Sequence, residues 1–325
     1  MILDRNTKHL RFRPHTLRPL SWRNLMSISY TSCTLCPRMC RIDRRTSRGY
    51  CQADNTIKIA RAALHPWEEP CISGTNGSGT VFFSGCNLKC VFCQNHTLSH
   101  DNFGKEISVE RLAKIFLELQ EKGAHNINLV TATHYLPSIK EAFNLLGSKL
   151  TIPVVYNCGG YERVETIQEY SDYIDIYLPD LKYHNSELSA KYSKAGDYFA
   201  HASKAIEEMI RITDGLSWNK ENPELLDRGV IIRHMVLPGA KDDSIRLLHW
   251  IKDSLPEGKY LVSLMSQYTP FHRSSEFPEI NRRITSYEYN KVLDIAIELG
   301  LVHGYMQEKS SAKEEYTPPF DLSGV

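Results

Sequence analysis

The chain has 325 residues, enough to bury one large core, or one core with a small appendage. Its 39 Lys and Arg almost balance its 38 Asp and Glu, so no global positive field favours a nucleic-acid partner. No apolar run approaches the roughly 18 residues that a membrane-spanning helix needs, so we expect no membrane anchor of this kind.

Residues 1–30 are rich in arginine and contain a single acid, Asp4. An arginine-rich, acid-poor start is typical of organelle transit peptides. Pro14 and Pro19, however, interrupt the amphipathic helix that such a peptide forms. We therefore expect a solvated basic arm, and we expect the protein to be cytoplasmic.

Residues 31–75 form a cysteine-rich region. Four thiols fall within it at metal-binding spacing, namely Cys33, Cys36, Cys40 and Cys51. Four thiolates close a coordination sphere, so the site should be structural or electron-carrying. Tetrahedral sulfur ligation suits either zinc or an iron–sulfur cluster, and both remain open.

Five arginines surround these cysteines: Arg38, Arg41, Arg44, Arg45 and Arg48. They compensate the thiolate charge locally, or they form a docking face for an acidic electron donor such as flavodoxin or ferredoxin. We favour local compensation. Cys71 and Cys158 have no partner by spacing and are expected to be ordinary buried cysteines.

A strand is predicted over residues 80–83, and a second cysteine group follows it directly. Cys86, Cys90 and Cys93 have the spacing C-x3-C-x2-C, which lets three thiolates wrap one [4Fe–4S] cluster. Three thiolates leave one iron without a protein ligand, and S-adenosylmethionine (SAM) can chelate it. An electron passed to the sulfonium then gives a 5′-deoxyadenosyl radical that abstracts hydrogen. A zinc loop is the plainer alternative, but no fourth ligand lies nearby.

Beyond this loop, apolar runs alternate with helical patterns up to about residue 308. The expected strands are 127–130, 153–156, 173–178, 229–237 and 260–265, with a last apolar stretch over 301–305. The expected helices are 109–119, 137–146, 186–194, 199–213, 245–255 and 285–299. Strands that alternate with helices predict a parallel α/β sheet, either open or closed into a barrel. In both folds the reactive groups belong at the carboxyl ends of the strands.

The cysteine loop and its strand–loop–helix setting resemble the radical-SAM superfamily, which implies a partial (β/α)6 barrel over residues 76–308. More closely, the chain resembles homologues of pyruvate formate-lyase activating enzyme that carry an extra N-terminal cysteine region. The matching segments are 33–38, 67–70, 73–75 with 79–80, the cluster loop, and 316–322 within a C-terminal tail, 309–325.

The resemblance also implies a set of SAM-binding residues. Phe92 matches an aromatic that packs on the adenine, and Asp180-Leu181-Lys182 matches a motif at the SAM site. Thr133 and His134 stand where activating enzymes have Gly-Gly-Glu, and Gln267 stands where they have a His. A Gly159-Gly160-Tyr161-Glu162 stretch occurs instead after the third of the barrel strands. Asn157 and Arg233 complete the predicted cofactor site. A purely structural Asp180–Lys182 pair is the alternative.

The predicted function is that of a radical SAM oxidoreductase with a [4Fe–4S] cluster and SAM as cofactors. The resemblance implies activation of a protein partner by forming a radical on it. The two departures at 133–134 and 267 speak against a glycyl-radical target, so radical modification of another substrate is the runner-up. Two hypotheses come from other functional classes. The protein is an iron–sulfur electron carrier without SAM turnover, or it is a zinc-dependent binding module built on residues 33–51.

Overall fold

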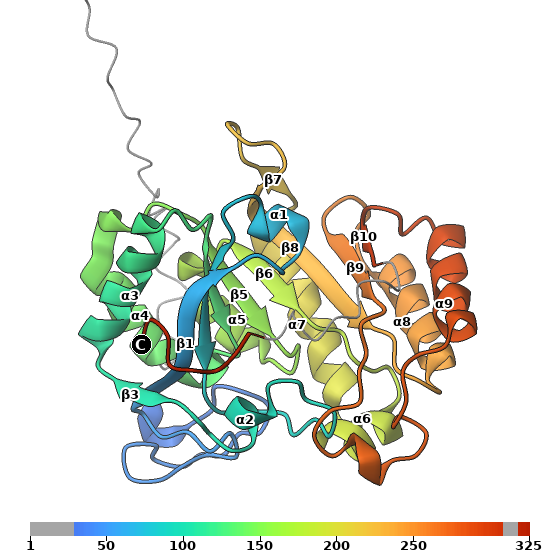
Figure 1. Cartoon of the computed structure of the whole chain (residues 1–325), viewed down its shortest axis with the longest axis horizontal. Helices are drawn as coiled ribbons and strands as arrows, with labels where there is room; N and C mark the ends of the chain where they lie inside the picture. Colours follow the sequence, from blue (N-terminus) through green and yellow to red (C-terminus); the bar gives the residue numbers. More distant parts are fainter. Residues whose placement is uncertain (1–28, 308–317) are drawn as a thin grey trace, which may run out of the picture.

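The computed structural model describes residues 29–307 and 318–325 (Figure 1). The predicted basic arm therefore lies almost wholly outside the described residues, as does the first part of the predicted tail. The described strands are β1 (Ile57–His65), β2 (Ser78–Phe83), β3 (Lys105–Ile107), β4 (Ile127–Val130), β5 (Val154–Cys158), β6 (Ile176–Pro179), β7 (Ser217–Trp218), β8 (Leu226–Met235), β9 (Leu261–Met265) and β10 (Gly304–Met306). The described α-helices are α1 (Pro70–Ser73), α2 (His96–Ser99), α3 (Val109–Glu121), α4 (Leu136–Leu146), α5 (Val164–Tyr170), α6 (Ser186–Ser193), α7 (Tyr198–Thr213), α8 (Lys241–Ser254) and α9 (Ser286–Glu298).

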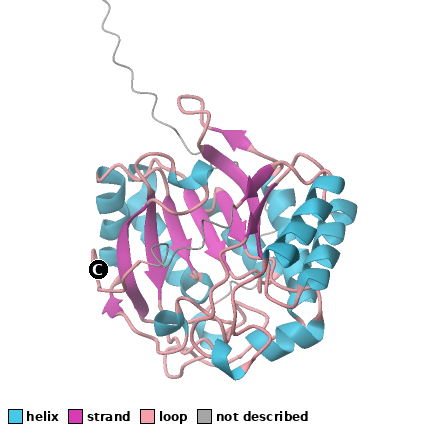
Figure 2. Cartoon of the chain, turned by 45° about the vertical axis from the view of Figure 1, so that its right-hand side comes forward, coloured by secondary structure: helices cyan, strands magenta, loops and turns pink. Residues whose placement is uncertain are grey.

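All of the strands belong to one curved sheet (Figure 2). Its order is β10-β9-β8-β6-β5-β4-β2-β1-β3, with β7 paired to β8. The strands from β2 to β10 along this order pair in parallel, whereas β1 pairs antiparallel with β2 and β3. The predicted α/β fold with a mostly parallel sheet is confirmed. The carboxyl ends of the parallel strands consequently meet at one edge, where the predicted site residues lie.

The two faces of the sheet are buried in different ways. Helices α3, α4, α7, α8 and α9 pack on the outer face, and the largest apolar core lies beneath them (Figure 1). The inner face carries a separate apolar cluster in which Val155, Ile176 and Ile231 contact Ile72 of α1. Helix α1 therefore covers the inner face near the amino ends of the parallel strands, the end opposite to the cysteine loop.

Several strand boundaries differ from those predicted. The strand expected over 173–178 begins only at Ile176, because Ser171–Tyr173 continue helix α5 as a 3-10 turn. The strand expected over 229–237 begins at Leu226 and ends at Met235. Strand β1 was not predicted, since its alanine-rich sequence does not alternate regularly between apolar and polar residues. It makes the sheet begin at Ile57, inside the range assigned to the cysteine-rich region.

The described part of the C-terminal tail lies along β1. The amide of Leu322 donates to the carbonyl of Ala60 at 3.0 Å, and the amide of Ala62 donates to the carbonyl of Ser323 at 2.8 Å. The ring of Phe320 packs edge-on against Phe82 of β2, with centroids 5.4 Å apart. Residues 318–325 thus occupy the part of the outer edge of β1 that β3 leaves free.

Candidate functional site

The cysteine loop starts immediately after β2 and turns sharply at Gly85. This residue has φ of 91°, and a Cβ atom there would lie 2.6 Å from the carbonyl oxygen of Cys51. Only glycine fits such a position without strain. The next amide, that of Cys86, donates to the same carbonyl at 3.3 Å. The loop is therefore held directly against the N-terminal cysteine region.

Each of the three loop thiols has a hydrogen-bond partner. The amide of Leu88 donates to Cys86 Sγ at 3.4 Å, and the Ser99 hydroxyl donates to Cys93 Sγ at 3.2 Å. Cys90 Sγ lies 3.0 Å from the hydroxyl of Ser193. Burial raises the pKa of Cys86 to about 12 and that of Cys93 to about 11, so these thiols need a bound cation to ionise at neutral pH.

These donors fit an iron–sulfur cluster. Three thiols on one loop, each next to an N–H or O–H group, suit a cubane in which separate irons take one thiolate each. Hydrogen bonds to the sulfurs stabilise the thiolate charge. No three Cys, His, Asp or Glu side chains in the described part of the chain converge on a position for one single metal ion.

A buried ion-pair network lies beside Cys90, at the carboxyl ends of β5, β6 and β8. Lys182 Nζ donates to Asp180 at 2.6 Å, and Arg233 donates to Asp180 at 2.9 Å and to Asn157 Oδ1 at 2.6 Å. Burial lowers the pKa of Lys182, but the charge of Asp180, the charge of the Cys90 thiolate and the hydrogen bond to Asp180 together outweigh it and raise that pKa to about 12. Four of the predicted cofactor-binding residues are therefore together, and both cations remain charged.

Thr133 lies in a second buried cluster, with Glu162. The Thr133 hydroxyl donates to Glu162 Oε1 at 2.8 Å and accepts from the hydroxyl of Tyr156 at 2.8 Å. Burial raises the pKa of Glu162 to about 8, so its carboxyl is mostly protonated at neutral pH. The Glu of the Gly-Gly-Tyr-Glu stretch thus reaches Thr133 from the neighbouring strand. Sequence analysis noted this stretch but did not assign Glu162 to the site.

The remaining predicted residues take different positions. His134 is buried, and its Nε2 lies 2.7 Å from the carbonyl of Ser84, next to the cysteine loop. Burial lowers the pKa of His134 to about 3, so the ring is neutral and donates this hydrogen bond. Phe92 is buried against Tyr268, with ring centroids 5.7 Å apart, and Gln267 follows β9. Of these three residues, His134 is the one that supports the backbone of the cysteine loop.

The four N-terminal cysteines lie in a compact turn against the loop. The amide of Cys33 donates to the carbonyl of Ile42, and the amide of Arg41 donates back to the carbonyl of Cys33, both at 2.9 Å. The amide of Tyr50 donates to Cys40 Sγ at 3.5 Å. Burial raises the pKa of the Cys36 and Cys51 thiols, as it does in the loop.

Most of the surrounding arginines have local partners. Arg44 is fully buried and donates to the carbonyls of Ala53, Asp54 and His134. Arg45 pairs with Asp43, and Arg48 pairs with Asp54. The guanidinium of Arg38 stacks 4.0 Å above the ring of Tyr50 and donates to the carbonyl of Asn87. The bonds of Arg44 to His134 and of Arg38 to Asn87 join the cysteine-rich region to the barrel, and the other contacts lie within that region.

Sequence analysis missed the polar residues of the inner face. Glu68 and Glu69 precede α1, and Glu68 pairs with Arg233 at 3.4 Å. The segment 67–70 was noted only as a match to related proteins, because nothing in its spacing places it beside β8. The inward direction of Asn128 follows from its register beside Val155, which is visible only in the folded sheet.

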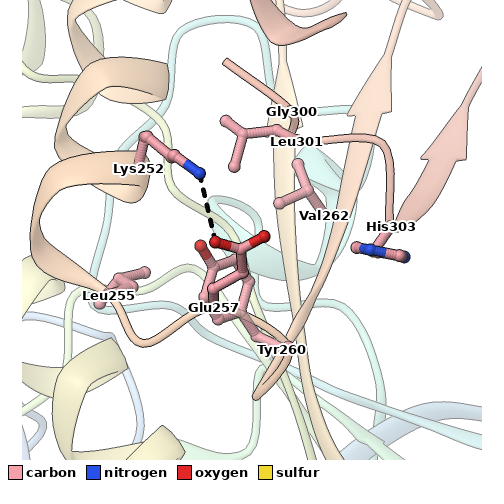
Figure 3. Close-up of a pocket in the computed structure, with 9 residues that line it drawn as sticks. Lys252, Leu255, Glu257, Tyr260, Val262, Gly300, Leu301 and His303 are labelled. Atoms are coloured by element: carbon pink, nitrogen blue, oxygen red, sulfur yellow. Dashed lines mark hydrogen bonds and ion pairs between the residues drawn. The ribbon is translucent and has the colours of Figure 1, made fainter.

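A small pocket lies elsewhere, between α8 and the starts of β9 and β10 (Figure 3). Lys252 and Glu257 form an ion pair at 3.4 Å across its mouth, and Tyr260 and His303 line its wall. These residues precede their strands, so the pocket is at the amino ends of the parallel strands. In α/β barrels that end stabilises the fold, and catalysis takes place at the other.

The family is decided by comparison with known proteins. Residues 80–251 match the model of the radical SAM superfamily, and this range holds the cysteine loop and the ion-pair network. The chain belongs to the radical SAM superfamily. An uncharacterized protein of Methanocaldococcus jannaschii is 32% identical over 278 residues, which cover 82% of this chain and 75% of that protein.

Three solved structures share part of the course of this chain at low sequence identity. SuiB of Streptococcus suis bound to S-adenosylmethionine is 14% identical, covers 69% of this chain and has a TM-score of 0.44; the chain spans about half (48%) of SuiB. Methylornithine synthase (PylB) is 14% identical, with a TM-score of 0.43, over 65% of this chain and 59% of its own. A domain of a pyruvate-formate lyase-activating enzyme from Bacteroides vulgatus is 14% identical, with a TM-score of 0.34, over 62% of this chain and 91% of its own.

Membership of this superfamily implies an enzyme that cleaves SAM at an iron–sulfur cluster, and the loop of Cys86, Cys90 and Cys93 has the residues for it. Among the residues that the structure describes, no helix is long and apolar enough to cross a membrane.

Proposed function

We propose that this radical SAM enzyme abstracts a hydrogen atom from a substrate held on the inner face of its barrel. The observation that carries the proposal is the polar network from Lys182 beside Cys90, through Asp180 and Arg233, to Glu68. Lys182 and Glu68 keep 20% and 10% of their side-chain surface accessible, so the network is not sealed off. An inner face built only for stability would not need so many buried charges.

Cys86, Cys90 and Cys93 would hold the cluster, which supplies an electron to the sulfonium of SAM when both are bound. Lys182 and Arg233 offer cationic hydrogen-bond donors to the carboxylate and ribose of SAM, and Asp180 orients both cations. Phe92, buried at the third cysteine, offers an apolar surface to the adenine. Glu162, bonded to Thr133 through Oε1, has a second carboxyl oxygen without a partner among the described residues and would offer an acceptor to the ammonium group of SAM.

The substrate defines two forms of this proposal. The matching segments at 33–38, 67–70 and 316–322 support an activating enzyme that forms a radical on a protein partner. Thr133 and Gln267, which stand in place of residues usual in those enzymes, support radical modification of another substrate. We propose the second form, because the charged residues of the inner face provide a separate means of recognising a substrate.

The N-terminal cysteines would hold a second iron–sulfur cluster or a zinc ion; zinc would require their thiols to move together, because no three of them converge on one metal position in the described part of the chain. The contact of the Cys51 carbonyl with Cys86 supports an electron-carrying role, since an electron donor such as flavodoxin or ferredoxin could then reach the SAM cluster through this region. Structural zinc would support the loop from the same place.

Anaerobic reconstitution with iron, sulfide, SAM and dithionite tests the proposed function. The wild type should release 5′-deoxyadenosine, and Cys86→Ala, Cys90→Ala and Cys93→Ala should each lower the rate to that of the uncatalysed reaction. Cys71→Ala removes a buried thiol outside the loop and should retain cleavage. Release of 5′-deoxyadenosine by any of the three loop variants would refute the proposal. Deuterium exchanged from labelled metabolites or proteins into 5′-deoxyadenosine would then distinguish the two substrate classes.

A further inference from the structure

The inner face contains two adjacent carboxylates that the SAM chemistry does not use. Glu68 and Glu69 (the acid pair) enter from the segment between β1 and α1. Glu68 contacts Arg233 and lies 3.3 Å from the amide nitrogen of Asn157. Glu69 is 8% exposed, and its Oε2 atom has no hydrogen-bond partner among the described residues.

A buried amide with an unfilled acceptor faces the acid pair. Asn128 is fully buried, and its Nδ2 approaches the Glu68 carboxyl only as a weak donor, which slightly offsets the rise in the pKa of Glu68 that burial causes. Its Oδ1 atom has no donor within the described part of the chain. A buried amide oxygen without a donor is destabilising, so a bound group that supplied an N–H there would be favoured.

The charges on this face do not balance. Three carboxylates, those of Glu68, Glu69 and Asp180, share the cations Arg233 and Lys182. Arg233 is already engaged with Asp180, Asn157 and Glu68. Burial raises the pKa of both carboxyls of the acid pair, and the positive charge of Arg233 lowers it, so a second cation against these carboxyls would favour their ionised form in the same way. With both carboxyls ionised, one more cation would balance the charge of these five groups.

We propose that the acid pair and Asn128 bind a cationic group of the substrate, an ammonium or a guanidinium. Either group supplies several N–H donors, enough for Glu69 Oε2, a Glu68 oxygen and Asn128 Oδ1 together. Such a substrate would be held at the base of the inner face, with its other end toward the cysteine loop. This inference rests on the proposed function, because it assigns the substrate class of the same site.

Calorimetric titration of the anaerobically reconstituted enzyme with small probes tests it. n-Butylammonium and n-butylguanidinium should bind at least about tenfold more tightly than neutral n-pentanol, and pentanoate should not bind. Glu69→Gln should weaken both cations about tenfold or more. Glu208→Gln makes the same change in a buried carboxyl on the outer face and should leave their affinities unchanged.

Asn128→Leu separates recognition from folding. A purely structural amide would make this variant less stable, whereas a recognition amide should be replaceable with no loss of thermal stability but with weaker cation binding.

Equal binding of pentanol and the cations, tighter binding of pentanoate, or unchanged cation affinity in Glu69→Gln would overturn the inference. An enzyme that cleaves SAM but shows no cation preference contradicts only this inference. One that prefers cations but cannot cleave SAM contradicts the proposed function instead.

Discussion

Cluster potential depends on the groups that donate to the cysteine sulfurs, and here two of those groups are serine hydroxyls. Ser99 donates to Cys93, and its oxygen lies 2.9 Å from Nδ1 of His100. Burial lowers the pKa of His100 to about 4, so its ring is neutral at pH 7. The cysteine, the serine and the histidine therefore form one hydrogen-bonded row next to the cluster.

Replacing Ser99 with Ala should make the reduction potential of the cluster more negative. The hydroxyl stabilises charge on sulfur, and the reduced cluster carries more of that charge. Potentiometric titration followed by electron paramagnetic resonance measures the shift. Ser203→Ala removes a hydroxyl that donates to a carbonyl within α7 and should leave the potential unchanged. A potential equal to the wild type in Ser99→Ala would show that this contact does not act on the cluster.

Glu162 makes the stability of the enzyme depend on pH. Its pKa is 4.5 in an unfolded chain and about 8 in the buried site, so the unfolded state loses the proton first as pH rises. Stability is therefore lost between about pH 4.5 and pH 8, and Glu162→Gln should remove this loss, which amounts to several kcal/mol. Thermal unfolding midpoints at pH 5 and pH 8 test it. The unfolding midpoint of Glu162→Gln should exceed that of the wild type at pH 8 but not at pH 5. Glu165→Gln, at an exposed carboxyl, should show no such increase in midpoint.

The sequence predicted the residues whose chemistry depends on local spacing. Cys86, Cys90 and Cys93 act from one loop, so their spacing alone identifies them. Asp180 and Lys182 also lie within one short motif at a strand end. Glu69 and Asn128 could not be found in this way, because only the register of β4 and the turn before α1 bring them to the same face.

At the level of secondary structure, most barrel strands were predictable because they are largely apolar, as buried parallel strands must be. Strand β1 was not predictable in this way. It lies beyond the parallel strands, and several of its residues are only partly buried, so its sequence is not continuously apolar. The turn that carries Cys33–Cys51 has little regular structure of its own. It depends on buried Arg44 and on hydrogen bonds from Arg163 and Thr166 to its carbonyls.

The metal of this turn can be identified by counting atoms in a variant that lacks the loop thiols. In the Cys86/Cys90/Cys93 triple alanine variant, four residual irons per chain would indicate a second cluster, and one zinc without iron would indicate a structural site. With zinc, Cys36→Ser should unfold the turn, because bound zinc contributes to its folding free energy. If the turn holds a cluster, the Cys36→Ser variant should fold, but flavodoxin should reduce its SAM cluster more slowly than that of the wild type. If the triple variant contained neither iron nor zinc, that result would contradict the proposed site.

At the scale of the whole molecule, the tail closes one edge of the sheet. Removing residues 318–325 should cost about 2–4 kcal/mol, because two backbone hydrogen bonds to β1 and the packing of Phe320 are lost. Asp321→Asn removes the charge from an exposed ion pair with Arg61 and should lower stability much less than the truncation does. Thermal unfolding measures both. A truncated protein as stable as the wild type would show that the tail does not support the sheet.

The pairing of the tail with β1 also orders events during synthesis. A ribosome releases β1 long before residues 318–325, so the outer edge of β1 has unpaired N–H and C=O groups while the barrel strands between them are translated. Neighbouring nascent chains on one messenger expose the same edge at the same time, which favours strand exchange between them. Slow translation anywhere between β1 and residue 318 should therefore lower the yield of monomeric protein more than slow translation before β1.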